Sequence, residues 1–275
     1  MTTTDTRVIR FVKEVNQAKL GSIVNWLDLD KELGIKRKPG KKLNIQSFSL
    51  PSGYSCPFAS DCLSKADRVT GKITDGKETL YRCFAASLEA IYINSRNLRW
   101  DNFDILKHLE TDEMVPLILE ALPDDCDICR IHIGGDFFNQ KYFDAWLEVA
   151  RLRPDVLFYA YTKSLPYWVA RLGTIPSNLR LNASRGSRTD YLIDKHNLKV
   201  AEVVLSPEEA AAKGLEIDHD ERHAVQDTGN FALLIHGTQP KGSAAAEAKR
   251  AMDKRIKAGE NIQYAYPKRT AKTVE

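Results

Sequence analysis

The chain has 275 residues, of which 43% are hydrophobic and 28% are charged, as in an ordinary globular protein. This composition excludes the disordered, collagen-like and coiled-coil classes, and the length allows one large domain or two small ones. The net charge is only +3, but residues 1–42 and 241–275 each carry +5 whereas residues 43–240 carry −7. The N-terminus lacks the apolar segment of a signal peptide and no apolar run could span a bilayer, so we expect a cytoplasmic protein without membrane contact.

The first part of the chain predicts an extension, a strand and a cysteine-bearing loop. Residues 1–42 form a basic N-terminal extension that ends in the turn-rich segment IKRKPGKK. Alternating residues predict a strand at 43–50, and a segment dense in Ser, Pro and Gly predicts a loop at 51–83. Apolar residues at helical spacing then predict helices from 84 to about 98 and from about 103 to 122.

From residue 129 onward, strands and helices alternate regularly. Strands are predicted at 129–134, 155–162, 179–184, 199–206 and 231–236, with a short one at 223–226. Helices are predicted at 139–152, 164–173, about 188–196, 207–214 and 243–259. This alternation indicates βαβ units and a parallel sheet. No glycine-rich dinucleotide motif opens a helix and no P-loop motif occurs, so neither kind of nucleotide site is expected.

The predicted fold class is therefore α/β, in the form of a full or partial TIM-like (β/α) barrel. The barrel would span residues 43–259, with the N-terminal extension before it and a basic helix closing it. Residues 260–275 would form a basic tail.

Polar residues and glycines gather where the predicted strands end, which is where parallel α/β folds place their active sites. Gly134, Gly135 and Asp136 follow one strand, and Lys163, Arg185 and His236 follow three others. A period of two places His132, Gly134 and Asp136 on one face of their strand, which we expect to be the inside. Each of these residues alone could be an ordinary polar loop residue, but together they predict one site.

The five cysteines fall into two groups, and their odd number in a cytoplasmic chain argues against a complete disulfide set. Cys56 and Cys62 lie in turns and Cys83 precedes a helix, where backbone N–H groups stabilise sulfur charge. They suit an iron–sulfur cluster that leaves one iron for another ligand, for which His236 is well placed; three unrelated thiols are the alternative. Cys126 and Cys129 form a C-x-x-C pair at the opposite end of a strand, and we expect both to be spectators.

Several motifs together resemble the gene product 88 family of phage proteins. They are Asn16 with Lys19, Leu20 and Gly21, followed by SLPSGYSCP (49–57), RCFAAS (82–87), IHIGGDFF (131–138), AW (145–146) and FYAYTKS (158–164). The resemblance runs from about residue 16 to 240. It implies a phage protein of the host cytoplasm, and it supports the barrel and the cysteine cluster more than any activity.

A more distant similarity is to radical S-adenosylmethionine enzymes, which are partial barrels with three cluster cysteines after the first strand. Their Gly-Gly-Glu motif lies near the amino group of the cofactor and is similar to Gly134, Gly135 and Asp136, so the resemblance implies that Gly134 and Gly135 bind a cofactor. His236, the candidate fourth ligand, is the third residue that we expect at a cofactor. The cysteine spacing here is C-x5-C-x20-C instead of C-x3-C-x2-C. This departure counts against S-adenosylmethionine as a cofactor.

Three functions follow as hypotheses. The first is an iron–sulfur barrel protein, most simply with a [4Fe–4S] cluster on Cys56, Cys62 and Cys83, and with redox or radical chemistry on a small-molecule or macromolecular substrate. His132 and Asp136 would act as acid or base, and Lys163 and Arg185 would bind an anionic group. The second is a nucleic-acid-associated protein that grips phosphate through its basic ends. The third is a zinc-bound structural barrel without catalysis.

Overall fold

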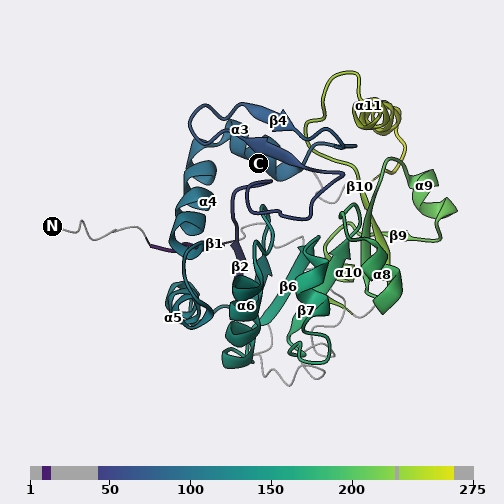
Figure 1. The fold of residues 1–275 in the computed structure, drawn as a ribbon. Coiled ribbons are helices and arrows are strands. Elements are labelled where there is room, and N and C mark those ends of the chain that lie inside the picture. The colour runs from purple at the N-terminus through teal and green to yellow at the C-terminus, as the bar shows by residue number, and fades with distance from the viewer. Residues whose placement is uncertain (1–7, 14–42, 227–228, 263–275) are drawn as a thin grey trace, which may run out of the picture.

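An eight-stranded sheet forms the centre of the molecule (Figure 1). The computed structural model describes residues 8–13, 43–226 and 229–262. The strands lie side by side in the order β1 (Val12–Lys13), β2 (Ile45–Phe48), β5 (Ile128–Ile131), β6 (Leu157–Thr162), β7 (Leu179–Ser184), β8 (Val200–Val204), β10 (Phe231–Leu234) and β9 (Glu216–Ile217). Strand β1 pairs antiparallel with β2, and every other pair is parallel.

The sheet is open. From β2 to β10 its parallel strands follow one another in chain order, apart from the short β9 at the edge. A closed barrel needs its last strand to pair with its first. In the described part of the chain the edges are the two-residue strands β1 and β9, which do not pair with each other. The predicted α/β class with a parallel sheet is confirmed, whereas the closed barrel that we also allowed is not formed by these residues.

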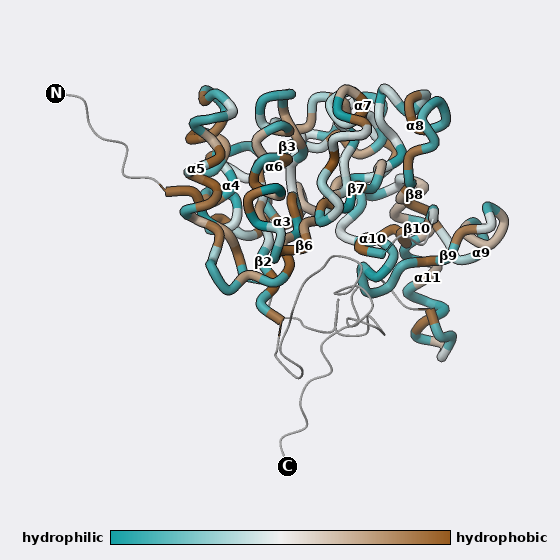
Figure 2. The backbone as a smooth tube through the Cα atoms, turned by 90° about the horizontal axis from the view of Figure 1, so that it is seen from below, coloured by the Kyte–Doolittle hydropathy of each residue, from teal (hydrophilic) through white to brown (hydrophobic). Residues whose placement is uncertain are grey.

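Helices follow most of the parallel strands (Figure 1). Their bounds are α3 (Phe84–Ile91), α4 (Ile93–Leu106), α5 (Thr111–Ala121), α6 (Gln140–Leu152), α7 (Leu165–Val169), α8 (Tyr191–His196), α9 (Pro207–Ala212), α10 (Arg222–Val225) and α11 (Ala244–Lys257). Figure 2 shows α5 changing between hydrophobic and hydrophilic positions along its length, as expected of a helix with one buried face. Among the described residues, no helix is long and apolar enough to cross a bilayer.

Alternate residues of the strands pack on opposite sides of the sheet. On β6, Phe158 and Ala160 join the large core beneath α5 to α8, whereas Leu157 and Tyr159 belong to a second core on the other face. That second core also contains Ala224 and Val225 of α10. Both faces of the sheet are therefore buried, as is usual for parallel sheets.

Some predicted elements differ in the structure. The strand predicted at 223–226 is instead the helix α10, because four residues are too few to show a period. The two helices predicted between 84 and 122 are three, with breaks at Tyr92 and before Thr111. The second break coincides with a reciprocal capping box between Glu110 and Glu113, which fixes a new helix start.

The cysteine loop contains a small hairpin that the sequence did not predict. Strands β3 (Ser64–Ala66) and β4 (Ile73–Asp75) pair antiparallel outside the main sheet. They lie at the same end of the molecule as α3 and α11 (Figure 1). The hairpin separates Cys62 from Cys83 in the sequence while keeping the ends of the loop close together.

Candidate functional site

A cavity of about 170 Å³ lies where the carboxyl ends of the parallel strands meet the cysteine loop. All of the predicted site residues except Arg185 line it. They are Cys56, Cys62, Cys83, His132, Gly134, Gly135, Asp136, Lys163 and His236. The structure therefore brings together residues from five segments that are far apart in the sequence.

The three cysteines of the loop share one wall of this cavity. The backbone N–H of Gly53 donates to Cys56 Sγ at 3.3 Å, and Cys83 occupies the N-cap position of α3. Burial raises the pKa of Cys56 well above its usual value and that of Cys62 to about 11. Burial also raises the pKa of Cys83, against the opposing effect of the first backbone N–H groups of α3. The protein alone therefore keeps all three thiols protonated at neutral pH.

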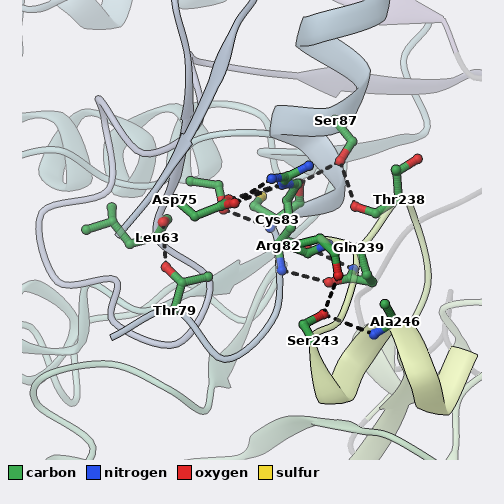
Figure 3. A network of polar contacts seen from close by, with 12 residues as sticks. Leu63, Asp75, Thr79, Arg82, Cys83, Ser87, Thr238, Gln239, Ser243 and Ala246 are labelled. Carbon is green, nitrogen blue, oxygen red and sulfur yellow. Dashed lines mark hydrogen bonds and ion pairs between the residues drawn. The ribbon is translucent and has the colours of Figure 1, made fainter. Parts of the chain in front are cut away.

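The network in Figure 3 holds Cys83 against the end of the chain's last strand. The Gln239 side chain accepts from the Arg82 backbone N–H at 2.8 Å and donates to the Arg82 carbonyl at 3.2 Å. It also donates to the His236 carbonyl at 2.9 Å. The His236 ring lies 4.8 Å from the ring of Phe84, centroid to centroid. The His236 ring therefore contacts the residue that follows Cys83, and its role as fourth ligand stays a prediction.

His132 differs from the prediction of an inward-facing side chain. Its ring packs on Phe137 at a centroid distance of 4.8 Å, and its Nε2 lies 3.0 Å from the Tyr142 hydroxyl, both in the core beneath the helices. Its backbone has a φ of 71°, in the left-handed region. The alternation of side chains between the two faces of β5 therefore ends before His132. Burial, reinforced by the charge of Arg130, lowers its pKa to about 3. The ring is neutral at pH 7.

Asp136 and Lys163 are both buried at the cavity wall. Asp136 accepts from the Thr162 hydroxyl at 2.6 Å and from the backbone N–H groups of Phe137 and Lys163 at 2.7 and 2.8 Å. Burial outweighs these bonds and raises its pKa to about 6. Lys163 Nζ donates to the Ser184 hydroxyl and to the carbonyls of Ser184 and Arg185. Because an ammonium has three donors, this geometry leaves none for the predicted anionic group.

Arg185 lies outside the cavity. Its guanidinium is one-third exposed and contacts Glu202 at 3.2 Å and Asp194 at 3.8 Å. The two cations that we expected to bind one anion are therefore engaged elsewhere in this structure.

The two glycines after β5 are explained by packing. A Cβ on Gly134 would lie 2.6 Å from Arg99 Nη1, and one on Gly135 would lie 2.6 Å from both Leu50 Cβ and Ser55 Oγ. Glycine is needed at both positions for this close approach. Their predicted cofactor-binding role stays a prediction.

Sequence reasoning missed a group of charged residues that line the same cavity. Arg130 in the middle of β5 forms an ion pair with Glu221, which also accepts from the Tyr159 hydroxyl. The Arg130 guanidinium lies 5.1 Å from the centre of the Tyr161 ring. Asp218 lines the same space. The one signal in the sequence was an arginine inside an otherwise apolar strand.

Cys126 and Cys129 are buried and do not line the cavity. Cys126 Sγ lies 3.3 Å from the Ile128 carbonyl, and Cys129 belongs to the core beneath the helices. Their location agrees with the expected spectator role. Within the described residues, no three or more His, Cys, Asp or Glu side chains are grouped closely enough to hold a metal ion.

The nucleic-acid hypothesis stays a prediction, because most of the two basic ends lies outside the described residues. Those parts include the segment at 35–42 and the tail from 263. On α11, Lys249 pairs with Asp253, and Arg255 pairs with Glu208 and Glu260. Lys254 and Lys257 of the same helix are exposed.

This chain is similar to known phage proteins. A family model described as "Gene product 88" matches residues 13–255. The "Gene 88 protein" of Mycobacterium phage L5 and that of Mycobacterium phage D29 are each 32% identical to this chain over 128 residues. These matches cover 42% of this chain and 47% of each relative, so the chain matches about half the length of these curated relatives. No solved structure matches it significantly. The chain belongs to the gene product 88 family of phage proteins.

Proposed function

We propose that the protein is an iron–sulfur protein in which Cys56, Cys62 and Cys83 hold the cluster, most simply a [4Fe–4S] cluster. The observation that supports this most is the shared cavity wall, on which two separate segments place three thiols at the carboxyl ends of the strands. Cysteine thiolates are the usual ligands of such clusters. His236, beside Cys83, is the candidate for the fourth iron.

A bound cluster would have to displace the protons of three buried thiols. Burial raises the pKa of each above its usual value. Metal binding releases protons from cysteine, because only the thiolate is a ligand. The backbone N–H groups beside Cys56 and Cys83 would help to stabilise the thiolates.

Zinc is the alternative metal for the three thiolates. In a four-iron cluster each cysteine binds a different iron, whereas all ligands of a zinc ion meet at one centre. Iron and sulfide analysis therefore separates the two alternatives.

The proposed chemistry takes place inside the open sheet, which we regard as a partial (β/α) barrel. A bound cluster would supply or accept one electron there. Asp136, with a pKa of about 6, can hold or release a proton at its carboxylate beside the cluster. Lys163 fixes the Ser184 and Arg185 backbone at the rim. The proposal does not require S-adenosylmethionine.

The test is metal and sulfide analysis of protein purified without oxygen. We expect a brown protein with about four irons and as many sulfides per chain. Single changes of Cys56, Cys62 or Cys83 to serine should each remove most of the iron. Cys126→Ser is the matched control, because a serine there can still donate to the Ile128 carbonyl.

Two results would contradict this proposal. One is a colourless, iron-free protein under those conditions, and the other is zinc without sulfide. Loss of iron from the Cys126→Ser variant equal to that from the other three would also show that the effect is not specific to the cavity.

A further inference from the structure

The lining of the cavity includes a charged pair. Arg130 and Glu221 are 8% and 6% exposed, and they come from segments 91 residues apart. Buried ion pairs contribute little to stability, because desolvation offsets their attraction. A pair maintained at a cavity wall is therefore better explained by what the cavity holds.

Backbone strain is found at the same place. Three described residues other than glycine have a positive φ, namely His132, Asn197 and Glu221. Asn197 ends the helix α8, where this conformation is common, but His132 and Glu221 both line the cavity. Strained residues gather at functional sites, where the surrounding structure enforces them.

Among the described residues that line the cavity, Asp218 is a buried carboxylate without a salt bridge. Arg82 pairs with Asp75, and Arg130 pairs with Glu221. Lys163 is bound by backbone carbonyls and lies near Asp136. Asp218, only 2% exposed, accepts from the backbone N–H groups of Asp220 and His223. It makes no ion pair with any described residue.

His223 is the nearest base to Asp218, but its ring is directed elsewhere. Its Nε2 lies 3.3 Å from Glu216, and the ring stacks on Phe231. The charge of His223 favours the ionised form of Asp218, whereas the carboxylates Asp220 and Glu221 oppose it. A buried carboxylate that makes no direct ion pair attracts a positive charge.

Apolar and aromatic side chains also line the cavity. Val203 and Leu233 come from the neighbouring strands β8 and β10, and Tyr161 comes from β6. A ligand that contacts both these side chains and the carboxylates has a charged head and a compact apolar body. The volume of about 170 Å³ is that of the whole cavity, including the wall with the three cysteines, so the ligand must be small.

We propose that this cavity binds a small organic amine, with its ammonium group at Asp218 and Glu221 and its apolar body against Tyr161, Val203 and Leu233. As the substrate site of the cluster chemistry, this inference rests on the proposed function. Its binding test does not, because binding can be measured whether or not iron is present.

The experiment is calorimetric titration of the full chain, purified without oxygen, with three probes of one shape. The probes are benzylamine, benzyl alcohol and benzoate at physiological salt. We expect benzylamine to bind at least about tenfold more tightly than the other two, since only it pairs with the carboxylates. Equal binding of the three, preference for benzoate, or no binding of benzylamine would overturn the inference.

Variants of the cavity residues test where the amine binds. Asp218→Asn should weaken benzylamine binding at least about tenfold, whereas Asp124→Asn, an exposed carboxylate before β5 at the other end of the sheet, should leave it unchanged. Val203→Phe should block the probe by filling the cavity, and it decides the matter if Asp218→Asn does not fold. Unchanged binding in a folded variant of Asp218 or Val203 would place the amine elsewhere.

The outcomes separate the two proposals. Iron without benzylamine binding leaves the cluster proposal standing and removes the amine site. Benzylamine binding that depends on Asp218 in iron-free protein keeps the amine site and removes the cluster.

Discussion

Asp218 is a residue whose burial opposes the stability of the free protein. Its pKa is raised to about 6, mainly by desolvation, with smaller effects of Asp220 and Glu221 in the same direction and of His223 and the Asp220 N–H in the opposite one. A carboxyl with a raised pKa binds its proton more tightly in the folded state. Its unfavourable contribution is therefore absent below about pH 4 and complete above about pH 6.

The first stability prediction concerns Asp218→Asn. Without ligand, this variant should have a higher free energy of unfolding than the natural protein at pH 8, by about 1–3 kcal/mol. The advantage should shrink by roughly 1 kcal/mol at pH 5, where the native carboxyl is largely protonated. Urea denaturation across this range measures it.

Asp124→Asn, at an exposed position, is the control for that measurement and should not reproduce the gain in stability. A variant at Asp218 that is destabilised equally at pH 5 and pH 8 would show that the carboxylate is needed for the fold itself. Gain of stability with loss of amine binding is the signature of a residue retained for binding.

At the scale of elements, the turn after β5 controls how the cysteine loop packs. Gly135 has a φ of 86°, and a Cβ there would lie within 2.6–2.9 Å of Leu50 and Ser55. The Leu50 N–H donates to the Gly134 carbonyl at 2.8 Å. The loop that contains Cys56 therefore begins directly against this turn.

Comparing two glycines separates packing from backbone strain. Gly173 has a similar φ of 80°, but a Cβ there would have no atom within 4 Å. Gly173→Ala should cost only about 1 kcal/mol, from the backbone alone. Gly135→Ala should cost roughly 3 kcal/mol or more, because loop and turn must also separate. Thermal unfolding of both variants measures the difference, and equal costs would show that the contact at Gly135 relaxes freely.

The sequence predicted the elements with strong periodicity and missed the short ones. The strands from β5 to β8 and the helix α6 appear where alternation and helical spacing placed them. The helix α10 and the strands β1, β3, β4 and β9 span only two to four residues each. Such segments are set by tertiary contacts, which no local pattern contains.

The candidate site was predictable at the rim and not in the interior. Cysteines, glycines and Asp136 follow strands directly, so topology alone brings them together. Glu221 and Asp218 come from the connection after β9, where no strand pattern indicated which way their side chains point. The positive φ of His132 reversed its expected face, and a single sequence gives no sign of that conformation in a histidine.

At the scale of the whole molecule, Gln239 joins the first half of the fold to the last. Its side chain contacts the backbone of Arg82 in both directions, across 157 residues. The Ser87 hydroxyl adds a bond to the Thr238 carbonyl at 3.3 Å (Figure 3). These contacts hold the segment of Cys83 beside His236.

Gln239→Leu should release this connection without changing the volume of the side chain much. It leaves the Arg82 N–H and two carbonyls without their partner, at a cost of about 1–3 kcal/mol. We expect faster hydrogen exchange at the Arg82 amide and, on the proposed function, faster loss of iron.

Gln140→Leu is the matched control, because Gln140 bonds to Asp144 and Tyr167 beneath the helices. It should leave exchange at Arg82 unchanged. Unaltered exchange in Gln239→Leu would show that the hairpin alone holds the segment.

The connection made by Gln239 also sets an order of events during synthesis. The ribosome delivers the cysteine loop early, but the partner that fixes Cys83 and the strand β10 that completes the wall arrive some 150 residues later. Chains fold as they emerge, from the N-terminus onward. The three thiols therefore pass through a long interval in the host cell before their cavity exists, so any group that they bind is delivered to a finished fold or protected by another factor until then.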